Sequence, residues 1–395
     1  MKPKPLIFIV NPGSASRKYA LYTGGLRLAT IHFEIVDGKV VGTLDYAGQH
    51  HVEKYDDANL ANAPHRTLPL LLKYGIITQT KDIDAIGIRI VAPSVKFTKD
   101  QLVTDSVINA LDALTQETPL HIKNAILEIK QLRIRFPKVP IIAISDSAFH
   151  TTKPTWAMHY GVNTALVTKL GIERYGYHGI SVGSIVYHLK KSGILLPKLI
   201  VCHLGSGSSV TAVYNGKSLD NTMGYSPLEG LMMSTRSGSI DVSAAMVIKR
   251  ELKLTDNGLE QYLDKQAGLL GVSGTSDDIR QLLVSEAKGD VRAKLALDMF
   301  VYRIQQAIGQ MAAGMNGVNC LVFTGTVGER SAIIRGRVLK RLSHLGFEID
   351  SARNRQVFEP TGVANLASGS SKPILVISTD EAAEIARRAE EFIKT

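Results

Sequence analysis

Residues 199–214 read Leu199-Ile200-Val201-Cys202-His203-Leu204-Gly205-Ser206-Gly207-Ser208-Ser209-Val210-Thr211-Ala212-Val213-Tyr214. The first six residues form an apolar run that is too short and too β-branched for a helix, which predicts a buried strand. The glycines and hydroxyl residues that follow allow backbone N–H groups to converge on an anion. The chain then returns as a second strand toward Asn215-Gly216, a strong hairpin signal. We therefore predict a strand, a phosphate-type turn and a strand, with an ordinary hairpin turn as the alternative.

The same pattern occurs at the start of the chain, in residues 6–22. The two copies match at Gly13 and Gly205, Ser16 and Ser208, Ala20 and Ala212, and Tyr22 and Tyr214. Such self-similarity indicates an internal duplication, and the distance between the copies is too long for a solenoid. We therefore expect two similar lobes, each beginning with a phosphate-facing hairpin, and a cleft that holds a phosphate chain from both sides.

Composition is typical of a soluble globular chain with two domains: 395 residues, 45% hydrophobic and 21% charged. The two cysteines, Cys202 and Cys320, have no disulfide-framework spacing and indicate a reducing compartment. No signal peptide or transmembrane run is apparent, so we expect a cytoplasmic protein without a membrane partner.

The formal net charge is +10, which suits either nucleic acid or an anionic small substrate. The basic residues are scattered, and local groups at 130–135 and 335–341 have helical spacing. Basic side chains on solvent-exposed helix faces explain this pattern better than a continuous basic surface that binds nucleic acid. We therefore expect no nucleic-acid partner.

Two arginines are candidates for binding an anion. Arg236 lies among hydroxyl residues and glycines, a setting that suits an oxyanion, although a lone arginine is more often a surface cation. Arg89 interrupts the buried strand predicted at 83–91 and needs a partner or a ligand there. An ion pair with a neighbouring carboxylate is the alternative for Arg89.

Two further candidate site residues lie next to predicted elements, one after a strand and one before a helix. Asp146 comes just after the strand predicted at 139–144, where open α/β sheets place their chemistry, with a cap as the alternative. His178 lies between Gly176 and Gly179, before a helix predicted at 182–191. A helix cap or a core hydrogen bond is the alternative for this histidine.

Near the end of the chain, a strand beginning at Cys320 is predicted to run through a glycine loop, Gly325–Gly328, into a helix over 332–345. That arrangement would place a helix N-terminus against an anion or a nucleotide. A further helix is predicted to begin at Pro119, with Ile122, Ile126, Ile129 and Leu132 on one face.

With these pieces in order, the sequence resembles the acetate kinase family over essentially the whole chain. The likeness rests on residues 11–18, 145–150, 174–179, 203–209, 226–233, 235–238, 323–325 and 378–381. The run Pro227-Leu228-Glu229-Gly230-Leu231-Met232-Met233, followed by Thr235-Arg236-Ser237-Gly238, is highly specific. Several motifs that agree in order carry more weight than any one of them.

The resemblance implies an α/β fold of two duplicated ribonuclease H-like (actin-like ATPase) lobes, each a mixed β-sheet flanked by helices. The first lobe would comprise residues 1–148 plus 380–395, which include a returning C-terminal helix, and the nucleotide-binding lobe residues 149–379. The implied activity is reversible phosphoryl transfer from ATP to acetate, giving acetyl phosphate and ADP, with Mg²⁺ or Mn²⁺. A homodimer is also implied.

The resemblance further implies residue roles. The catalytic group would be Arg89, Asp146, His178 and Arg236, and the metal-side residues Asn11 and Glu381. The acyl group would contact Arg89, Val91, Leu120, Tyr177 and Pro227. The nucleotide would contact Lys18, His203, Leu204, Gly205, Ser206, Gly207, Asp278, Ile279, Arg280, Gly325, Thr326, Val327, Gly328 and Glu329.

This sequence also departs from the family's pattern. Ala92-Pro93-Ser94 replaces a usual His-Gly-Gly run, Ser206 a usual Asn, Thr326 a Gly, Val182 a His and Tyr177 a Phe. A propionate or butyrate kinase, or a kinase that uses pyrophosphate, is therefore an alternative. A nucleotide-binding regulator with little catalysis is the alternative from outside the enzymes.

Overall fold

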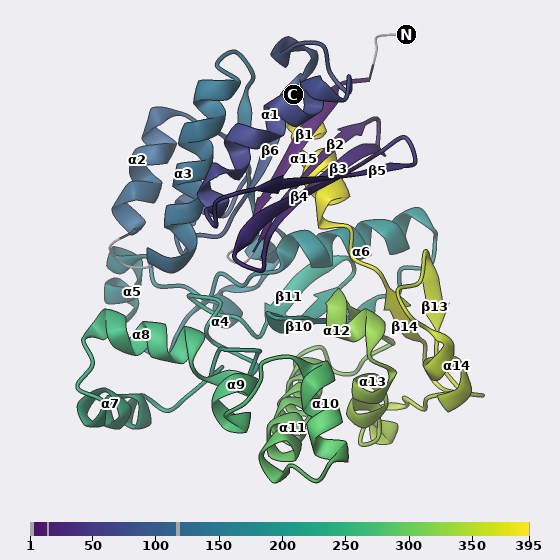
Figure 1. Cartoon of the computed structure of the whole chain (residues 1–395). Helices are drawn as coiled ribbons and strands as arrows, with labels where there is room; N and C mark the ends of the chain where they lie inside the picture. The colour runs from purple at the N-terminus through teal and green to yellow at the C-terminus, as the bar shows by residue number, and fades with distance from the viewer. Residues whose placement is uncertain (1–3, 14–15, 116–118, 395) are drawn as a thin grey trace. The chain divides into compact units, whose positions relative to one another are not determined.

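We describe a computed structural model of the chain over residues 4–13, 16–115 and 119–394, without the side chains of 119–121. The chain divides into two compact units (Figure 1). Unit 1 comprises Met1–Ala148 and Asp380–Thr395, and unit 2 comprises Phe149–Thr379. The nucleotide-binding role of the second unit stays a prediction.

Unit 1 contains an eight-stranded sheet in the order β5-β4-β3-β2-β1-β6-β8-β7. The strands are β1 (Leu6–Pro12), β2 (Ser16–Thr23), β3 (Leu26–Val36), β4 (Lys39–Tyr46), β5 (Gln49–Tyr55), β6 (Ala85–Ile90), β7 (Gln101–Leu102) and β8 (Ile141–Ser145). Strands β1 to β5 form an antiparallel meander, whereas β1, β6 and β8 are parallel.

Helices cover both faces of this sheet. They are α1 (Ala63–Lys73), α2 (Asp105–Leu114), α3 (Pro119–Arg135) and α15 (Glu381–Phe392). Phe8, Val10 and Ile88 belong to the core that includes α3, while a Cβ added to Gly87 would lie 2.8 Å from Ile385 of α15. Because successive strand residues face opposite sides, α3 and α15 cover opposite faces. The face under α15 is the one that carries Arg89.

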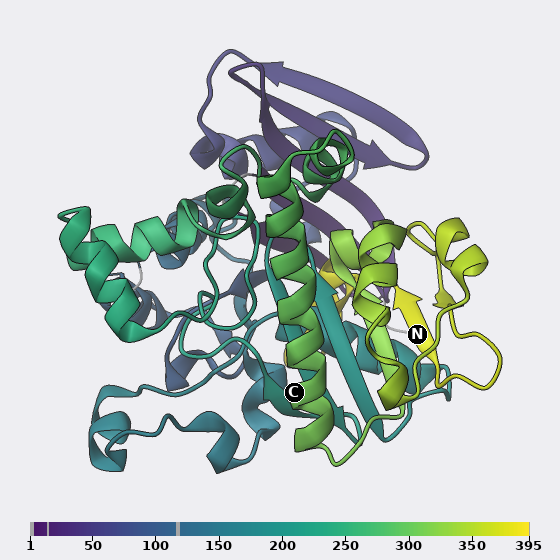
Figure 2. The same cartoon turned by 90° about the horizontal axis from the view of Figure 1, so that it is seen from below.

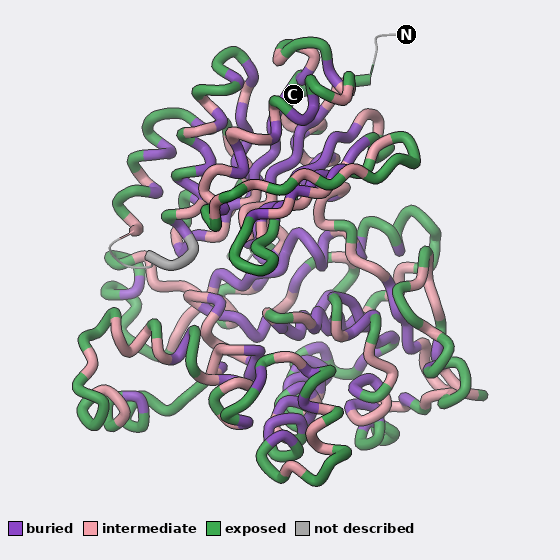
Figure 3. The backbone as a smooth tube through the Cα atoms, in the orientation of Figure 1, coloured by how far each residue is buried: buried purple, intermediate pink, exposed green. Residues whose placement is uncertain are grey.

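Unit 2 contains a six-stranded sheet in the order β11-β10-β9-β12-β14-β13. The strands are β9 (Lys198–Leu204), β10 (Ser208–Tyr214), β11 (Lys217–Asn221), β12 (Cys320–Thr324), β13 (Val363–Asn365) and β14 (Ile374–Ile377). One face packs on α6 (Gly179–Lys191) and the other on the long helix α11 (Val291–Gly314), which is seen lengthwise in Figure 2. Strands β9, β10, β12 and β14 are buried along almost their whole length (Figure 3), whereas the edge strands β11 and β13 are only partly buried.

The remaining helices of unit 2 lie before β9, between β11 and β12, or after β12. They are α4 (Thr155–Met158), α5 (Thr164–Leu170), α7 (Val242–Glu251), α8 (Asp256–Lys265), α9 (Gly268–Ser273), α10 (Ile279–Ala287), α12 (Gly325–Arg330), α13 (Ala332–Leu339) and α14 (Ser351–Gln356). Short 3₁₀ turns occur at Leu60–Asn62, Thr80–Asp82, Val95–Phe97, Ala148–Thr152 and Ser343–Leu345.

The duplication is confirmed at the level of topology. In each sheet, three antiparallel strands (β3-β2-β1 and β11-β10-β9) are followed by two parallel ones (β6-β8 and β12-β14). The hairpins differ in register, since Pro12 pairs with Arg17 but Leu204 pairs with Ser208. The second turn is therefore one residue shorter than a residue-by-residue match predicts.

Two expectations near β12 were wrong. The segment Gly325–Arg330 is not a glycine loop but the short helix α12, and the helix expected at 332–345 ends at Leu339. Gly325 has φ +77°, a conformation that favours glycine, and the Glu329 side chain accepts a hydrogen bond from the Gly325 N–H at 2.8 Å. This bond closes the first turn and makes the segment helical.

Candidate active site

In unit 1, four predicted residues lie together on the face covered by α15. Arg89 Nη2 donates to Asp146 Oδ2 at 2.9 Å, and Arg89 Nη1 lies 3.4 Å from Glu381 Oε2. Asn11 Nδ2 donates to the same Glu381 oxygen at 3.2 Å. The parallel strands β6 and β8 bring Arg89 and Asp146 together, because their registers align Ile90 with Ser145. The sequence left an ion pair with a neighbouring carboxylate as the alternative to a ligand for Arg89, and the structure contains such an ion pair.

This group combines burial with charge. Asp146 is fully buried and the side chain of Arg89 is only partly exposed. Burial would lower the pKa of Arg89, but the carboxylates of Asp146 and Glu381 raise it above its usual value. The guanidinium therefore stays charged and is held in place by two acids from different elements.

Lys18 was expected on the phosphate-binding turn but lies on strand β2, paired with Asn11 of β1. Directly paired strand residues share a face of the sheet, so Lys18 is on the same face as Asn11. Its side chain is exposed. The pair places a cation beside the Asn11 amide.

In unit 2, His178 and Arg236 both lie beside the turn that follows β9. A Cβ added to Gly207 would lie 3.1 Å from His178 Nε2 and 3.7 Å from Arg236 Nη1. His178 Nδ1 shares a hydrogen bond with Ser209 Oγ at 3.0 Å, and its backbone has φ +59° at the N-cap of α6. The turn, the imidazole and the guanidinium thus form one compact group.

A buried carboxylate orients Arg236. Arg236 Nε donates to Asp264 Oδ1 at 2.6 Å, and Lys265 Nζ lies 3.0 Å from the other carboxylate oxygen of Asp264. Burial would raise the pKa of Asp264, but Arg236 and Lys265 bring it below its usual value. The two Nη groups of Arg236 are not used in this ion pair, which is the orientation needed to bind an oxyanion.

A chain of hydrogen bonds connects the predicted nucleotide residues of unit 2. His203 Nδ1 and Ser181 Oγ lie 2.8 Å apart, and the Thr379 hydroxyl donates to Ser181 Oγ at 2.9 Å. Thr379 N–H donates to Glu329 Oε1 at 3.0 Å. Glu329 is buried and bonded within the protein, so its side chain supports the site rather than being available to a nucleotide.

The turn and α12 lie close to one another. A Cβ on Gly325 would meet Leu204 O at 2.7 Å, and one on Gly205 would lie 3.9 Å from Thr326 N. Leu204 and Gly328 are buried, Ser206 and Thr326 exposed, and Val327 intermediate. The Thr326 side chain therefore does not point into the core.

The predicted adenosine segment is placed at the start of α10. Asp278 is the N-cap and accepts from Arg280 N–H at 2.8 Å, while the Arg280 side chain is mostly exposed and ion-paired with it at 2.5 Å. The Ile279 side chain belongs to the core, so only its backbone can face a ligand.

The predicted acyl residues are distributed over both units. Val91 follows β6 in unit 1 and is half-buried, whereas Tyr177 and Pro227 are buried in unit 2. The Tyr177 hydroxyl donates to Tyr225 O at 2.6 Å, so it is committed to the protein instead of simply adding bulk. Leu120 is in α3, and its side chain lies outside the described residues.

The sequence did not predict the residues that support the segment around Pro227. Tyr160 donates to Glu229 Oε2 at 2.5 Å, and Arg174 forms an ion pair with Glu229. Tyr225 N–H donates to Tyr160 Oη at 2.8 Å. Arg174 and Glu229 occur in the recognised motifs, and this was the only signal for them.

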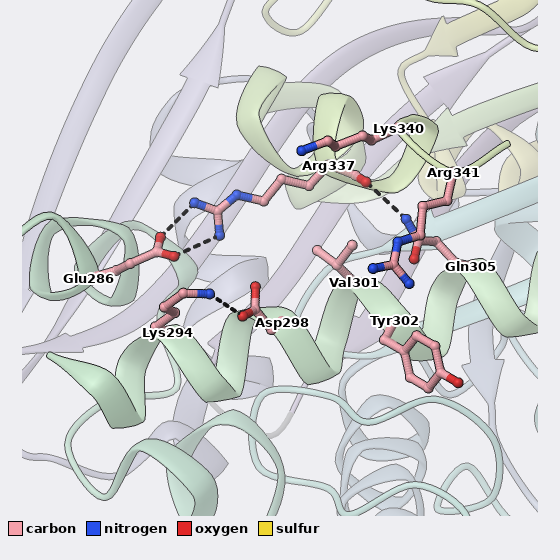
Figure 4. A pocket seen from close by; sticks show the side chains of 9 residues that line it. All are labelled: Glu286, Lys294, Asp298, Val301, Tyr302, Gln305, Arg337, Lys340 and Arg341. Atoms are coloured by element: carbon pink, nitrogen blue, oxygen red, sulfur yellow. Dashed lines mark hydrogen bonds and ion pairs between the residues drawn. The ribbon is translucent and has the colours of Figure 1, made fainter. Parts of the chain in front are cut away.

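One pocket of unit 2 involves none of the predicted residues. It measures about 550 Å³ and lies between α10, α11 and α13, where Arg337 pairs with Glu286 and Lys294 with Asp298 (Figure 4). Val301 and Tyr302 contribute apolar surface to it. Its charged side chains lie on helix surfaces and are mostly paired with one another, an arrangement that solvated helices commonly show.

The comparisons with known proteins agree with this geometry. The model of the acetokinase family matches residues 6–387. An acetate kinase from Clostridium botulinum is 36% identical, covering 98% of this chain and 99% of that protein, and one from Methanosarcina acetivorans is 35% identical, covering 98% and 97%.

Solved structures give the same result. The acetate kinase of Porphyromonas gingivalis superimposes with a TM-score of 0.86 at 31% identity, covering 98% of this chain and 100% of that chain. A propionate kinase from Francisella tularensis superimposes with a TM-score of 0.89 at 32% identity, covering 98% and 99%.

The repeated sheet topology, the arginine and carboxylates of unit 1, and the arginine, histidine and glycine turn of unit 2 define a phosphotransferase with an actin-like ATPase fold. Such a site binds and aligns anions. The chain belongs to the acetokinase family, and its acceptor is a carboxyl group.

Proposed function

We propose that the protein transfers the γ-phosphoryl group of ATP reversibly to acetate, with acetyl phosphate and ADP as products. The observation that carries this proposal is the pair of residue groups described above. Unit 1 presents Arg89, Asp146, Asn11 and Glu381, and unit 2 presents His178 and Arg236 beside Gly207. The names of the relatives support acetate as the acceptor.

The residue roles follow from charge. A carboxylate acceptor is already ionised at neutral pH, so the reaction needs alignment of anions and positive charge more than a base. Arg89 and Arg236 would bind the carboxylate and the transferring phosphoryl group, and His178 would donate a hydrogen bond to that group. Asp146 would orient Arg89, since it is ion-paired with it.

Mg²⁺ is the metal that this proposal includes. The hydrogen bond between Asn11 and Glu381 brings an amide and a carboxylate together, and Mg²⁺ prefers oxygen ligands. No group of three His, Cys, Asp or Glu suited to a metal occurs among the residues that the structure describes. A few protein ligands completed by water and phosphate oxygens suit Mg²⁺, which neutralises phosphate charge when bound.

The experiment uses one protein preparation and trapping of acetyl phosphate by hydroxylamine. We expect product with acetate, ATP and Mg²⁺, less with propionate, and none after addition of EDTA. An apolar pocket separates acids that differ by one methylene by only ~1–3 kcal/mol, so both acids must be compared by kcat/KM. Formation of product with pyrophosphate but not with ATP would overturn ATP as the phosphoryl donor. A higher kcat/KM for propionate than for acetate would overturn acetate as the acceptor.

We also propose a homodimer. Trp156, Val162, Leu166 and Leu170 are at least half exposed in the segment that contains α4 and α5. Four exposed apolar side chains within so short a segment favour contact with another protein surface, here a second copy of this chain. Light scattering should give twice the chain mass, and Trp156→Glu with Leu166→Glu should give the monomer mass.

Among the described residues, helices long and apolar enough to cross a membrane are absent. Cys202 and Cys320 are buried free thiols. The cytoplasmic location stays a prediction.

A further inference from the structure

A charged cluster is buried beneath the first hairpin, on the face of the sheet that α3 covers. It consists of Arg17 and Tyr19 on β2 and Glu128 on α3, each no more than 5% exposed. Arg17 and Tyr19 are two residues apart on one strand, so they share a face, whereas Lys18 between them faces the opposite side. None of the three residues belongs to the predicted site.

Contacts in this cluster connect the helix with the turn. Tyr19 Oη donates to Glu128 Oε1 at 2.5 Å, and Arg17 Nε lies 3.5 Å from Glu128 Oε2. The other end of the guanidinium donates to the carbonyl of Gly13 and reaches the carbonyl of Ser16 at 3.4 Å. One side chain thus bonds both ends of the turn between β1 and β2.

Gly13 and Ser16, the described residues on either side of residues 14–15, lie close together. A Cβ on Gly13 would lie 2.9 Å from Ser16 O, and Gly13 N–H donates to Asn11 O at 3.0 Å. Arg17 pairs with Pro12, and the next pair along the hairpin is Asn11 with Lys18. The positions of Asn11 and Lys18 are therefore coupled to the carbonyls that Arg17 holds.

A buried guanidinium and a buried carboxylate are costly and are retained where each is bonded. A hydrophobic pair of similar volume would pack in this place without that cost. Packing alone therefore does not require Arg17, whereas a guanidinium can bond the carbonyls of Gly13 and Ser16 through Nη1 while its Nε lies near Glu128.

We propose that Arg17 is a positioning residue for the phosphoryl donor: held by Glu128, it fixes the turn that sets Asn11 and Lys18 in place. This inference rests on the proposed function, in which Asn11 lies at the metal and Lys18 at the phosphates. Arg17 itself contacts neither the substrates nor the reacting atoms.

The test compares Arg17→Met, Arg17→Lys and the double variant Arg17→Met with Glu128→Leu. Arg17→Met should raise the KM for ATP on the order of tenfold to a hundredfold, because a misplacement of ~1 Å can cost 10²-fold. The KM for acetate should change little. Arg17→Lys should recover part of the effect, because it keeps the charge but has a single donor group.

The double variant separates positioning from stability. It removes both buried charges, so its Tm should return toward that of the parent protein, while the KM for ATP stays high. If the KM recovers together with the Tm, Arg17 is only structural and the proposal is wrong. Arg66→Met, which breaks the ion pair with Asp57 elsewhere in unit 1, is the matched control and should lower the Tm without changing the KM.

Hydrogen exchange gives a readout that does not depend on activity. In Arg17→Met the backbone amides of residues 16–18 should exchange faster than in the parent protein, while those of β6 keep their rates. If the parent protein forms no acetyl phosphate, the proposed function fails, and the exchange rates alone decide the role of Arg17. Unchanged exchange rates of the amides of residues 16–18 would overturn the proposed positioning role of Arg17.

Discussion

Arg89 and Asp146 form an ion pair of 2.9 Å at the ends of two neighbouring parallel strands, although 57 positions separate them in the sequence. Asp146 is fully buried, whereas the side chain of Arg89 is partly exposed. The ion pair therefore orients both side chains, and Asp146 is one of the two carboxylates that raise the pKa of Arg89 above its usual value.

Removing the cation should affect stability as well as catalysis. Arg89→Ala removes the guanidinium that is ion-paired with the buried Asp146 carboxylate, and breaking such a pair costs ~3–5 kcal/mol. We expect kcat to fall by at least ~10²-fold, as for the loss of a positioned oxyanion donor. Asp146→Asn keeps the shape and should preserve more stability. Urea unfolding and kcat are measured on both variants, and equal stability with normal kcat in Arg89→Ala would contradict the assignment.

Arg236 should behave differently, because its carboxylate has a second cation. In Arg236→Ala, Asp264 keeps Lys265 at 3.0 Å, so we expect a smaller loss of stability than in Arg89→Ala. The kcat should still fall by ~10²-fold or more. Circular dichroism melting and single-turnover phosphoryl transfer check the two parts of this prediction. Arg250→Ala, on the nearby helix α7, is the control that should leave both unchanged.

Tyr177→Phe tests whether the hydroxyl restricts the acyl group. The hydroxyl donates to the backbone carbonyl of Tyr225, and losing such a bond costs about 1 kcal/mol. We expect lower stability but a nearly unchanged ratio of kcat/KM for acetate and propionate. A marked gain in propionate use would show that the hydroxyl faces the acyl group.

Glu128 should make stability depend on pH. Burial raises the pKa of this carboxyl to about 7, although Tyr19 and Arg17 act in the opposite direction. An acid whose folded pKa is raised stabilises the fold below its unfolded pKa, and this contribution is lost as pH rises through the folded value. Between pH 4.5 and 7 the parent protein should therefore lose on the order of 3 kcal/mol relative to Glu128→Gln. Urea unfolding of both proteins across this range measures the difference, and parallel curves would contradict it.

Thr326→Gly tests the departure in the nucleotide segment. The side chain is exposed at the second position of α12, so we expect a modest change in the KM for ATP and little change in kcat. The variant also weakens a short helix, since glycine costs roughly 1 kcal/mol there. Thr326→Ala, which keeps helix propensity, is the matched control. A large fall in kcat in both variants would show that Thr326 acts on the transferring group.

The sequence predicted the strand, turn and strand units and their duplication because apolar runs and glycine turns are local signals. It also placed Asp146 just after a strand. It could not predict the ion pair of Arg89 with Asp146, because that contact depends on which strands are neighbours and in what register. The resemblance brought Arg89, Asp146 and Glu381 into one site, but their contacts came from the structure.

Helix α12 was missed for a related reason. Two glycines in Gly325-Thr326-Val327-Gly328 favour a loop by propensity, and the bond that closes the turn comes from the side chain of Glu329. The cluster of Arg17, Tyr19 and Glu128 was missed because Glu128 lies 109 positions after Tyr19 in the sequence. Long-range contacts of this kind override local propensity without leaving a local signal.

The last helix has a consequence for how the protein is made. Helix α15 covers the face of the unit 1 sheet that carries Gly87, yet its residues are synthesised only after those of unit 2. Until the ribosome has translated the whole of unit 2, that face of the sheet, including Ile9 and Ile142, lacks its cover. Nascent chains stalled before residue 380 should therefore bind chaperones through unit 1, and their release should require translation of residues 380–395.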